Sequence, residues 1–153
     1  MINPSAGKDA LQQRINTGAN WFYWIAGLTL VNSVAAYSGN QFRFIIGLGT
    51  TQVLDALASS SRLSAVALGI DALVILTCAI VGRYARVSRQ VYIAGMLAYG
   101  LDAILFVVFR DVFGLGFHAF ALWNLSKGLR AFGELRNPER PTAAERTVAV
   151  RAA

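Results

Sequence analysis

The chain has 153 residues, of which 56% are hydrophobic and only 14% are charged, and its mean hydropathy is +0.50. A soluble domain usually carries about 25% charged residues, so this composition argues against a soluble enzyme and predicts an integral membrane protein with one compact bundle. The net charge is +6, and most Lys and Arg lie in loops and the C-terminal tail. That placement favours a topology signal over nucleic-acid binding.

Residues 1–16 are predicted to form a polar N-terminal segment, with Asn16 or Thr17 placed to cap the first helix. The first apolar run, residues 21–37, opens with four aromatic residues, which is typical of a membrane interface. A signal peptide is the rival interpretation of this run, because Ser33-Val34-Ala35 approximates a cleavage site. So aromatic a start is unusual for a signal peptide, which favours a transmembrane helix.

Four further apolar runs follow the first one. They cover residues 42–58, 63–81, 91–109 and 112–132. The run at 42–58 is the weakest, since it contains Arg43, Asp55 and several small polar residues. We therefore expect a transmembrane helical bundle over residues 17–133, followed by a polar, flexible C-terminal tail over residues 134–153.

The predicted fold is all-α, a compact bundle of five transmembrane helices, and the alternative is four spans plus one interfacial or re-entrant helix. With five spans the N-terminus is external, and Asn32 lies at the internal end of the first helix. With four spans both termini are internal, which the cations at Lys8 and Arg14 favour. Both topologies predict a cytoplasmic C-terminus in a multi-pass protein of the cell membrane.

An internal repeat favours the five-span version. A shift of 47 residues places Asp55 on Asp102 and Asp71 on His118. In each half the two ionisable residues are 16 apart (55 to 71 and 102 to 118), so they flank a predicted turn symmetrically. Residues equidistant from the turn of an antiparallel hairpin lie at equal depth. The pattern predicts two tandem helical hairpins that hold all four groups in one layer.

Ionisable groups inside the membrane are costly and usually face the bundle interior, so this layer is the predicted ligand or cation site. Its proposed members are Asp55, Asp71, Asp102, His118, Gln52 and Tyr99. Tyr99 is three residues before Asp102 on a helix, which predicts a hydrogen bond between the two side chains. The alternative to a ligand site is a structural role, in which polar side chains between membrane helices only hold the helices together. No metal or cofactor follows from the sequence.

Two other features limit the chemistry. Cys78 is the single cysteine, so the CxxC pair of a thiol oxidoreductase is absent. Many glycines lie within the apolar runs, where they are expected to allow close helix approach. These glycines are Gly47, Gly49, Gly69, Gly95, Gly100, Gly114 and Gly116.

Several segments resemble those of small, uncharacterised bacterial multi-spanning membrane proteins. They include Trp21-Phe22-Tyr23-Trp24, Gly47-Leu48-Gly49-Thr50-Thr51, Tyr99-Gly100-Leu101-Asp102 and Gly116-Phe117-His118. The resemblance covers residues 16 to about 132 and implies a location in the bacterial inner membrane. It implies no activity and no catalytic residue.

Three functions fit these features. A transporter or channel would pass a proton, a cation or a small polar solute through the acidic layer. A structural or partner protein of the membrane would use the layer only for helix association. A metal-dependent intramembrane enzyme is the third and weakest, because one histidine cannot build a three-His site. The bilayer is the expected partner, nucleic acid is not, and a thin bundle of this size favours a homodimer.

Overall fold

The computed structural model describes residues 4–38, 48–51, 53 and 64–136. Four long helices make up most of this part of the chain: α1 (Pro4–Tyr37), α3 (Ser64–Tyr84), α4 (Arg89–Val108) and α5 (Val112–Arg136). A further helical segment begins at Gly49, and the described residues contain no strand. The predicted all-α class is therefore confirmed.

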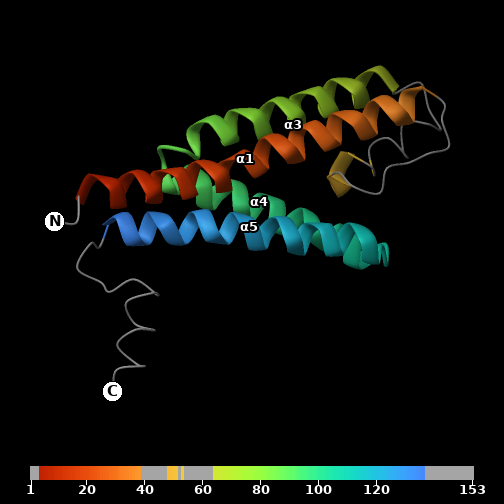
Figure 1. Cartoon of the computed structure of the whole chain (residues 1–153). Helices are drawn as coiled ribbons and strands as arrows, with labels where there is room; N and C mark the ends of the chain where they lie inside the picture. Colours follow the sequence, from red (N-terminus) through yellow and green to blue (C-terminus); the bar gives the residue numbers. More distant parts are fainter. Residues whose placement is uncertain (1–3, 39–47, 52, 54–63, 137–153) are drawn as a thin grey trace.

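Each of the four long helices runs antiparallel to the one before it in the chain, so α1 begins at the end of the bundle where α5 ends (Figure 1). The helix α1 packs against α3 on one side and α5 on the other, and α4 packs mainly against α5. The contact between α3 and α4 is the smallest of the four. Tyr37, which ends α1, and Ser64, which begins α3, lie at the same end of the bundle.

The helix α1 begins much earlier than the sequence predicted. It starts at Pro4 and continues without a break, so the predicted caps at Asn16 and Thr17 are wrong. Residues 4–16 are held because they meet other elements. The Gln12 amide donates to the Arg86 carbonyl oxygen at 3.1 Å, and Arg14 pairs with Glu134 at 3.1 Å. These tertiary contacts replace a local start signal.

The turn between α4 and α5 falls at the predicted break. Arg110 adopts a left-handed conformation, with φ of 56°, and the Asp111 N–H donates to the Phe106 carbonyl, which closes the end of α4. The Asp111 carboxylate then accepts the Gly114 N–H at 3.0 Å and caps the start of α5. Asp111 therefore has a local structural role.

The buried interior has an apolar half and a polar half. The apolar half lies toward the start of α1 and is built around Ala19, Phe22, Tyr92 and Leu125. The polar half lies toward the other end. Its fully or nearly buried polar residues are Thr29, Asn32, Ser33, Thr51, Asp71, Asp102 and His118. This division places the candidate residues Asp71, Asp102 and His118 in one half of the bundle.

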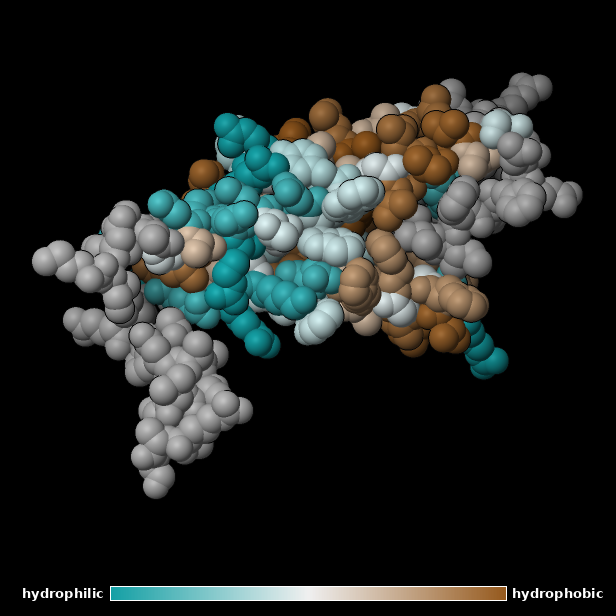
Figure 2. Space-filling model, in the orientation of Figure 1, coloured by the Kyte–Doolittle hydropathy of each residue, from teal (hydrophilic) through white to brown (hydrophobic). Residues whose placement is uncertain are grey.

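The outer surface is strongly apolar. In the described part of the chain two helical segments are long and apolar enough to cross a membrane, Val66–Tyr84 and Arg89–Val108, and only 17% and 22% of these windows are buried. The core helix of a soluble protein would be mostly buried instead. Hydrophilic residues gather over the half where α1 begins, and hydrophobic residues gather over the other half (Figure 2). These features indicate a membrane location.

Close packing between α1 and α5 depends on two glycines that the sequence did not single out. A Cβ at Gly18 would lie 2.9 Å from the Gly128 Cα and would also meet the Tyr92 hydroxyl. Among the predicted close-approach positions, Gly49, Gly95 and Gly114 are crowded, whereas Gly69 and Gly116 meet nothing. Apolar surroundings in the sequence did not distinguish crowded glycines from glycines on the outer surface.

The Gly18→Ala substitution should destabilise the bundle by about 1–3 kcal/mol, because the added methyl group forces α1 away from α5. The matched control is Gly27→Ala on the same helix, where a Cβ meets nothing within 4 Å. That change should be neutral or stabilising by about 0.5–1 kcal/mol. Thermal unfolding in detergent measures both, and equal melting temperatures for the two variants would contradict the close crossing.

Candidate functional site

A helix begins inside the bundle at the segment Leu48–Thr51. The first N–H groups of a helix have no acceptor within the helix, so they need partners from elsewhere. The Asp102 carboxylate on α4 supplies them. Its Oδ2 accepts the Gly49 N–H at 2.7 Å, and its Oδ1 accepts the Thr50 N–H at 2.9 Å and the Thr50 hydroxyl at 2.6 Å. The carboxylate therefore caps a helix from a distant part of the chain, as a local Asp does at an ordinary N-cap.

Two more features hold the segment in place. The Leu48 N–H donates to the Thr29 hydroxyl oxygen on α1 at 3.3 Å, and the Thr51 hydroxyl donates to the Leu48 carbonyl at 2.9 Å. A Cβ at Gly49 would lie 2.8 Å from the Phe106 ring, so a larger residue would move the backbone away from α4. Glycine at this position therefore allows the N–H to reach Asp102.

His118 completes the ring of donors around Asp102. Its Nε2 lies 3.1 Å from Asp102 Oδ2, and its Nδ1 lies 2.9 Å from the Gly114 carbonyl oxygen. A carbonyl oxygen can only accept, so Nδ1 carries a hydrogen. The Nε2–carboxyl contact then needs a second hydrogen, on either Nε2 or the carboxyl group. The Asp102–His118 pair therefore holds one proton more than a neutral imidazole and a carboxylate would.

Two aromatic rings enclose the His118 imidazole. The Tyr99 ring stacks on it with centroids 4.3 Å apart and an interplanar angle of 11°, and the Phe106 ring lies 4.5 Å away on a tilt. Tyr99 was predicted to hydrogen-bond Asp102, and that prediction is wrong. The Tyr99 hydroxyl is buried and has no hydrogen-bond partner among the described residues. Its ring, and not its hydroxyl, contacts the acid–imidazole pair.

Asp71 on α3 lies in a different setting from Asp102. Its side chain is 1% exposed, and its Oδ2 accepts the Ser33 hydroxyl at 3.1 Å. Its Oδ1, and the Oδ1 of buried Asn32, accept no hydrogen bond within the part of the chain that the structure describes. Asp71 thus has one buried oxygen that accepts no hydrogen bond among the described residues, whereas four hydrogen-bonding groups already surround the Asp102 carboxyl.

A half-enclosed cavity of about 310 Å³ lies between α3 and α4, above the α1 residues Phe22 and Ile25. Apolar side chains form most of its wall. Its polar lining residues are Thr50, Thr77, Cys78, Tyr99 and Asp102. The helices α3 and α4 on either side of the cavity share the smallest contact of the four helix pairs, and the cavity volume is at the lower end of the range of small-molecule sites.

The structure brings together part of the predicted layer. Asp102 and His118 meet, as expected for residues that flank the turn at residue 110 symmetrically. Asp55 and Gln52 lie outside the described residues, so the first hairpin of the predicted repeat cannot be compared. Within residues 4–38, 48–51, 53 and 64–136, no three His, Cys, Asp or Glu side chains gather as metal ligands.

Asn32 was predicted at the opposite end from the acidic groups, and that prediction is wrong. Its neighbour Ser33 donates to Asp71, so the two residues lie at the level of that carboxyl group. That prediction assumed the five-span topology, in which the first helix ends on the internal side. The sequence also gave no role to Thr29, Ser33 and the Leu48–Thr50 backbone. Only the Gly49-Thr50-Thr51 composition, small and polar within an apolar run, pointed to the segment.

Comparison with known proteins adds no functional assignment: no protein-family model, curated protein or solved structure matches the chain. The resemblance to bacterial multi-spanning membrane proteins therefore stays an expectation. The site has to be interpreted from its own geometry.

The Asp102→Asn substitution should lower the free energy of unfolding by about 1.5–3 kcal/mol, because an amide nitrogen in the place of either oxygen would meet a backbone N–H, of Gly49 or of Thr50, donor to donor. The control is Asp111→Asn, which keeps a good N-cap and should change stability little. Thermal or denaturant unfolding in detergent measures both. Equal stability of the two variants would contradict the capping role of Asp102.

The extra proton should be visible by NMR, since His118 is the single histidine in the chain. We expect ¹⁵N spectra of the parent to show a hydrogen on Nδ1, which the Gly114 carbonyl holds, and the state of Nε2 to show which partner of the Asp102 contact carries the shared hydrogen. In Asp102→Asn we expect a hydrogen on Nδ1 alone, because the amide can donate to Nε2. A parent spectrum without a hydrogen on Nδ1 would contradict the assigned tautomer.

Proposed function

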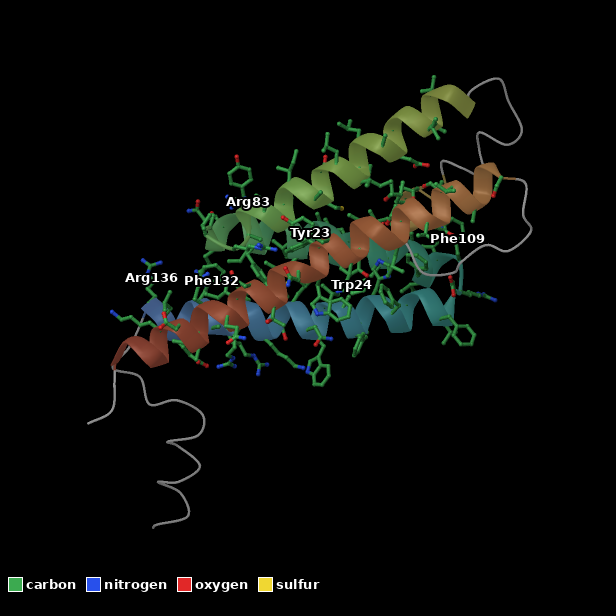
Figure 3. All side chains as sticks on the ribbon, turned by 45° about the horizontal axis from the view of Figure 1, so that its top comes forward. Tyr23, Trp24, Arg83, Phe109, Phe132 and Arg136 are labelled. Carbon is green, nitrogen blue, oxygen red and sulfur yellow. The ribbon has the colours of Figure 1, made fainter. Side chains whose placement is uncertain are left out.

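We propose that the chain is a four-span membrane protein with both termini in the cytoplasm. The antiparallel order of α1, α3, α4 and α5 supports this, since an even number of crossings returns the chain to its starting side. Cations gather at the end where α1 begins, which the positive-inside rule assigns to the cytoplasm. Arg83 and Arg136 lie toward that end, and Phe109 lies at the other (Figure 3).

Within that bundle, the proposed activity is movement of a proton or small cation through the polar half, with Asp71 as the exchanging group. The observation that carries the proposal is the Asp71 carboxyl, which is 1% exposed and has one oxygen without a donor among the described residues. A buried carboxylate with one hydrogen-bond donor is costly. Taking up a proton or a cation removes that cost, and releasing it completes a transfer.

Asp102 is the less suitable exchanging group, although the sequence predicted it in the same layer as Asp71. Its two oxygens already face the Gly49 N–H, two Thr50 donors and His118. A cation would have to displace a helix cap to reach them. In this proposal the Asp102–His118 pair is fixed and holds the segment Leu48–Thr51. The Asp71 carboxyl group is the one that exchanges a proton or cation.

A non-catalytic structural role is the second candidate, and the saturation of Asp102 favours it. A carboxylate whose acceptor sites are all used holds helices together without any transported species. In this reading Asp71 and Ser33 are a further interhelical contact, and the polar half sets the register of the four helices.

Proton flux into proteoliposomes that enclose a pH-sensitive dye separates the two. We expect the parent to acidify the interior faster than empty liposomes after an acid jump, and Asp71→Asn to abolish the excess rate. Asn has nearly the same shape and keeps an acceptor for the Ser33 hydroxyl, so the variant should fold. The control is Asp9→Asn, at an exposed residue near the start of α1, which should conduct like the parent.

Two results would contradict the proposal. A parent rate equal to that of empty liposomes, with Na⁺, K⁺ and H⁺ gradients alike, would overturn transport and leave the structural role, which predicts that Asp71→Asn changes only thermal stability. A parent rate above that of empty liposomes that is unchanged in Asp71→Asn would overturn Asp71 as the exchanging group.

A further inference from the structure

The turn between α3 and α4 carries three arginines at regular spacing, Arg83, Arg86 and Arg89, and no Asp or Glu occurs over residues 72–101. None of the three forms an ion pair within the residues that the structure describes. The turn therefore carries positive charge that nothing in the described structure neutralises, which attracts an anionic partner.

One of the three arginines holds the turn against α1. The Arg86 Nη2 donates to the Asn20 side-chain oxygen at 2.7 Å, and its guanidinium group lies 5.3 Å from the centre of the Tyr23 ring. Arg83 and Arg89 are exposed on either side of it along the chain. Their guanidinium groups are therefore the ones available to a partner outside the chain.

Apolar side chains accompany these arginines. Tyr84 is 56% exposed and Val87 is 71% exposed, and the outward residues Leu76 and Ile80 of α3 are 57% and 48% exposed. A tyrosine beside cations at the end of an apolar helix is typical of the membrane–water interface. The turn therefore lies in the headgroup layer, a step that rests on the proposed membrane location. The ends of α1 and α5 extend past it (Figure 1).

We infer that the turn between α3 and α4 binds the headgroups of anionic phospholipids through Arg83 and Arg89, with Tyr84 and Val87 in contact with the apolar part of the lipid. A guanidinium group forms paired hydrogen bonds to phosphate oxygens. The start of α4 at Arg89 adds the partial positive charge of a helix N-terminus. A soluble polyanion would leave the exposed Tyr84 and Val87 side chains in water, which favours a lipid.

Native mass spectrometry of the full chain, released from detergent micelles, measures the affinity for added lipid. The probes are phosphatidylglycerol, phosphatidylcholine with the same acyl chains, and inorganic phosphate. The test variant combines Arg83→Gln with Arg89→Gln. The matched control combines Lys8→Gln with Arg136→Gln, which removes the same charge from exposed residues near the ends of α1 and α5.

We expect the parent to bind phosphatidylglycerol about 25-fold more tightly than phosphatidylcholine, because each arginine near the headgroups contributes about fivefold. The arginine variant should bind the two lipids equally, through loss of affinity for phosphatidylglycerol alone. The control should keep the preference of the parent to within about twofold. Melting temperatures confirm that each variant is folded.

Equal affinity of the parent for the two lipids would overturn the headgroup site. Equal losses in the arginine variant and the control would also overturn it, because net charge and not this turn would then attract the lipid. Inorganic phosphate that binds as tightly as phosphatidylglycerol would overturn a lipid as the occupant. The flux assigned to Asp71 does not enter this measurement, so failure of either proposal leaves the other standing.

Discussion

The architecture depends on a helix that begins inside the bundle. The N–H groups at such a start have no partner within their own helix, and each would cost several kcal/mol in an apolar interior. Asp102 supplies three acceptor contacts to Gly49 and Thr50. His118 contacts Asp102 Oδ2 through its Nε2, and the Gly114 carbonyl and the cap at Asp111 orient His118. One connected network therefore joins the α4–α5 turn to the buried segment.

This network explains why the two described buried carboxyl groups differ in chemistry. A cap that must satisfy several N–H groups cannot also exchange a ligand freely, so the saturated Asp102 is suited to a fixed role. Asp71 meets one hydroxyl group, from Ser33, and keeps an oxygen without a donor in the described structure. Unused bonding capacity, more than charge, distinguishes the two carboxyl groups.

Much of the fold was predictable from composition and spacing. Long apolar runs predicted helices, and α3, α4 and α5 lie close to three of those runs. The pairing of Asp102 with His118 was also predictable, because two residues at equal distance from a tight turn lie at equal depth on an antiparallel hairpin. The early start of α1 was not, because its polar first turns are held by Arg86 and Glu134, which are distant in sequence.

The sequence by itself determined that the protein is helical, that its surface is apolar, and that a few ionisable groups must face inward, because these follow from local hydropathy and from the cost of charge in lipid. The tertiary structure alone decided which acceptor meets which donor. The role of Asp102 depends on backbone N–H groups about 50 residues away, and backbone groups are identical in every sequence pattern. Tyr99 was likewise predicted to bond Asp102, but its ring stacks on His118 instead. The reason is that side-chain direction depends on the packing of neighbouring helices.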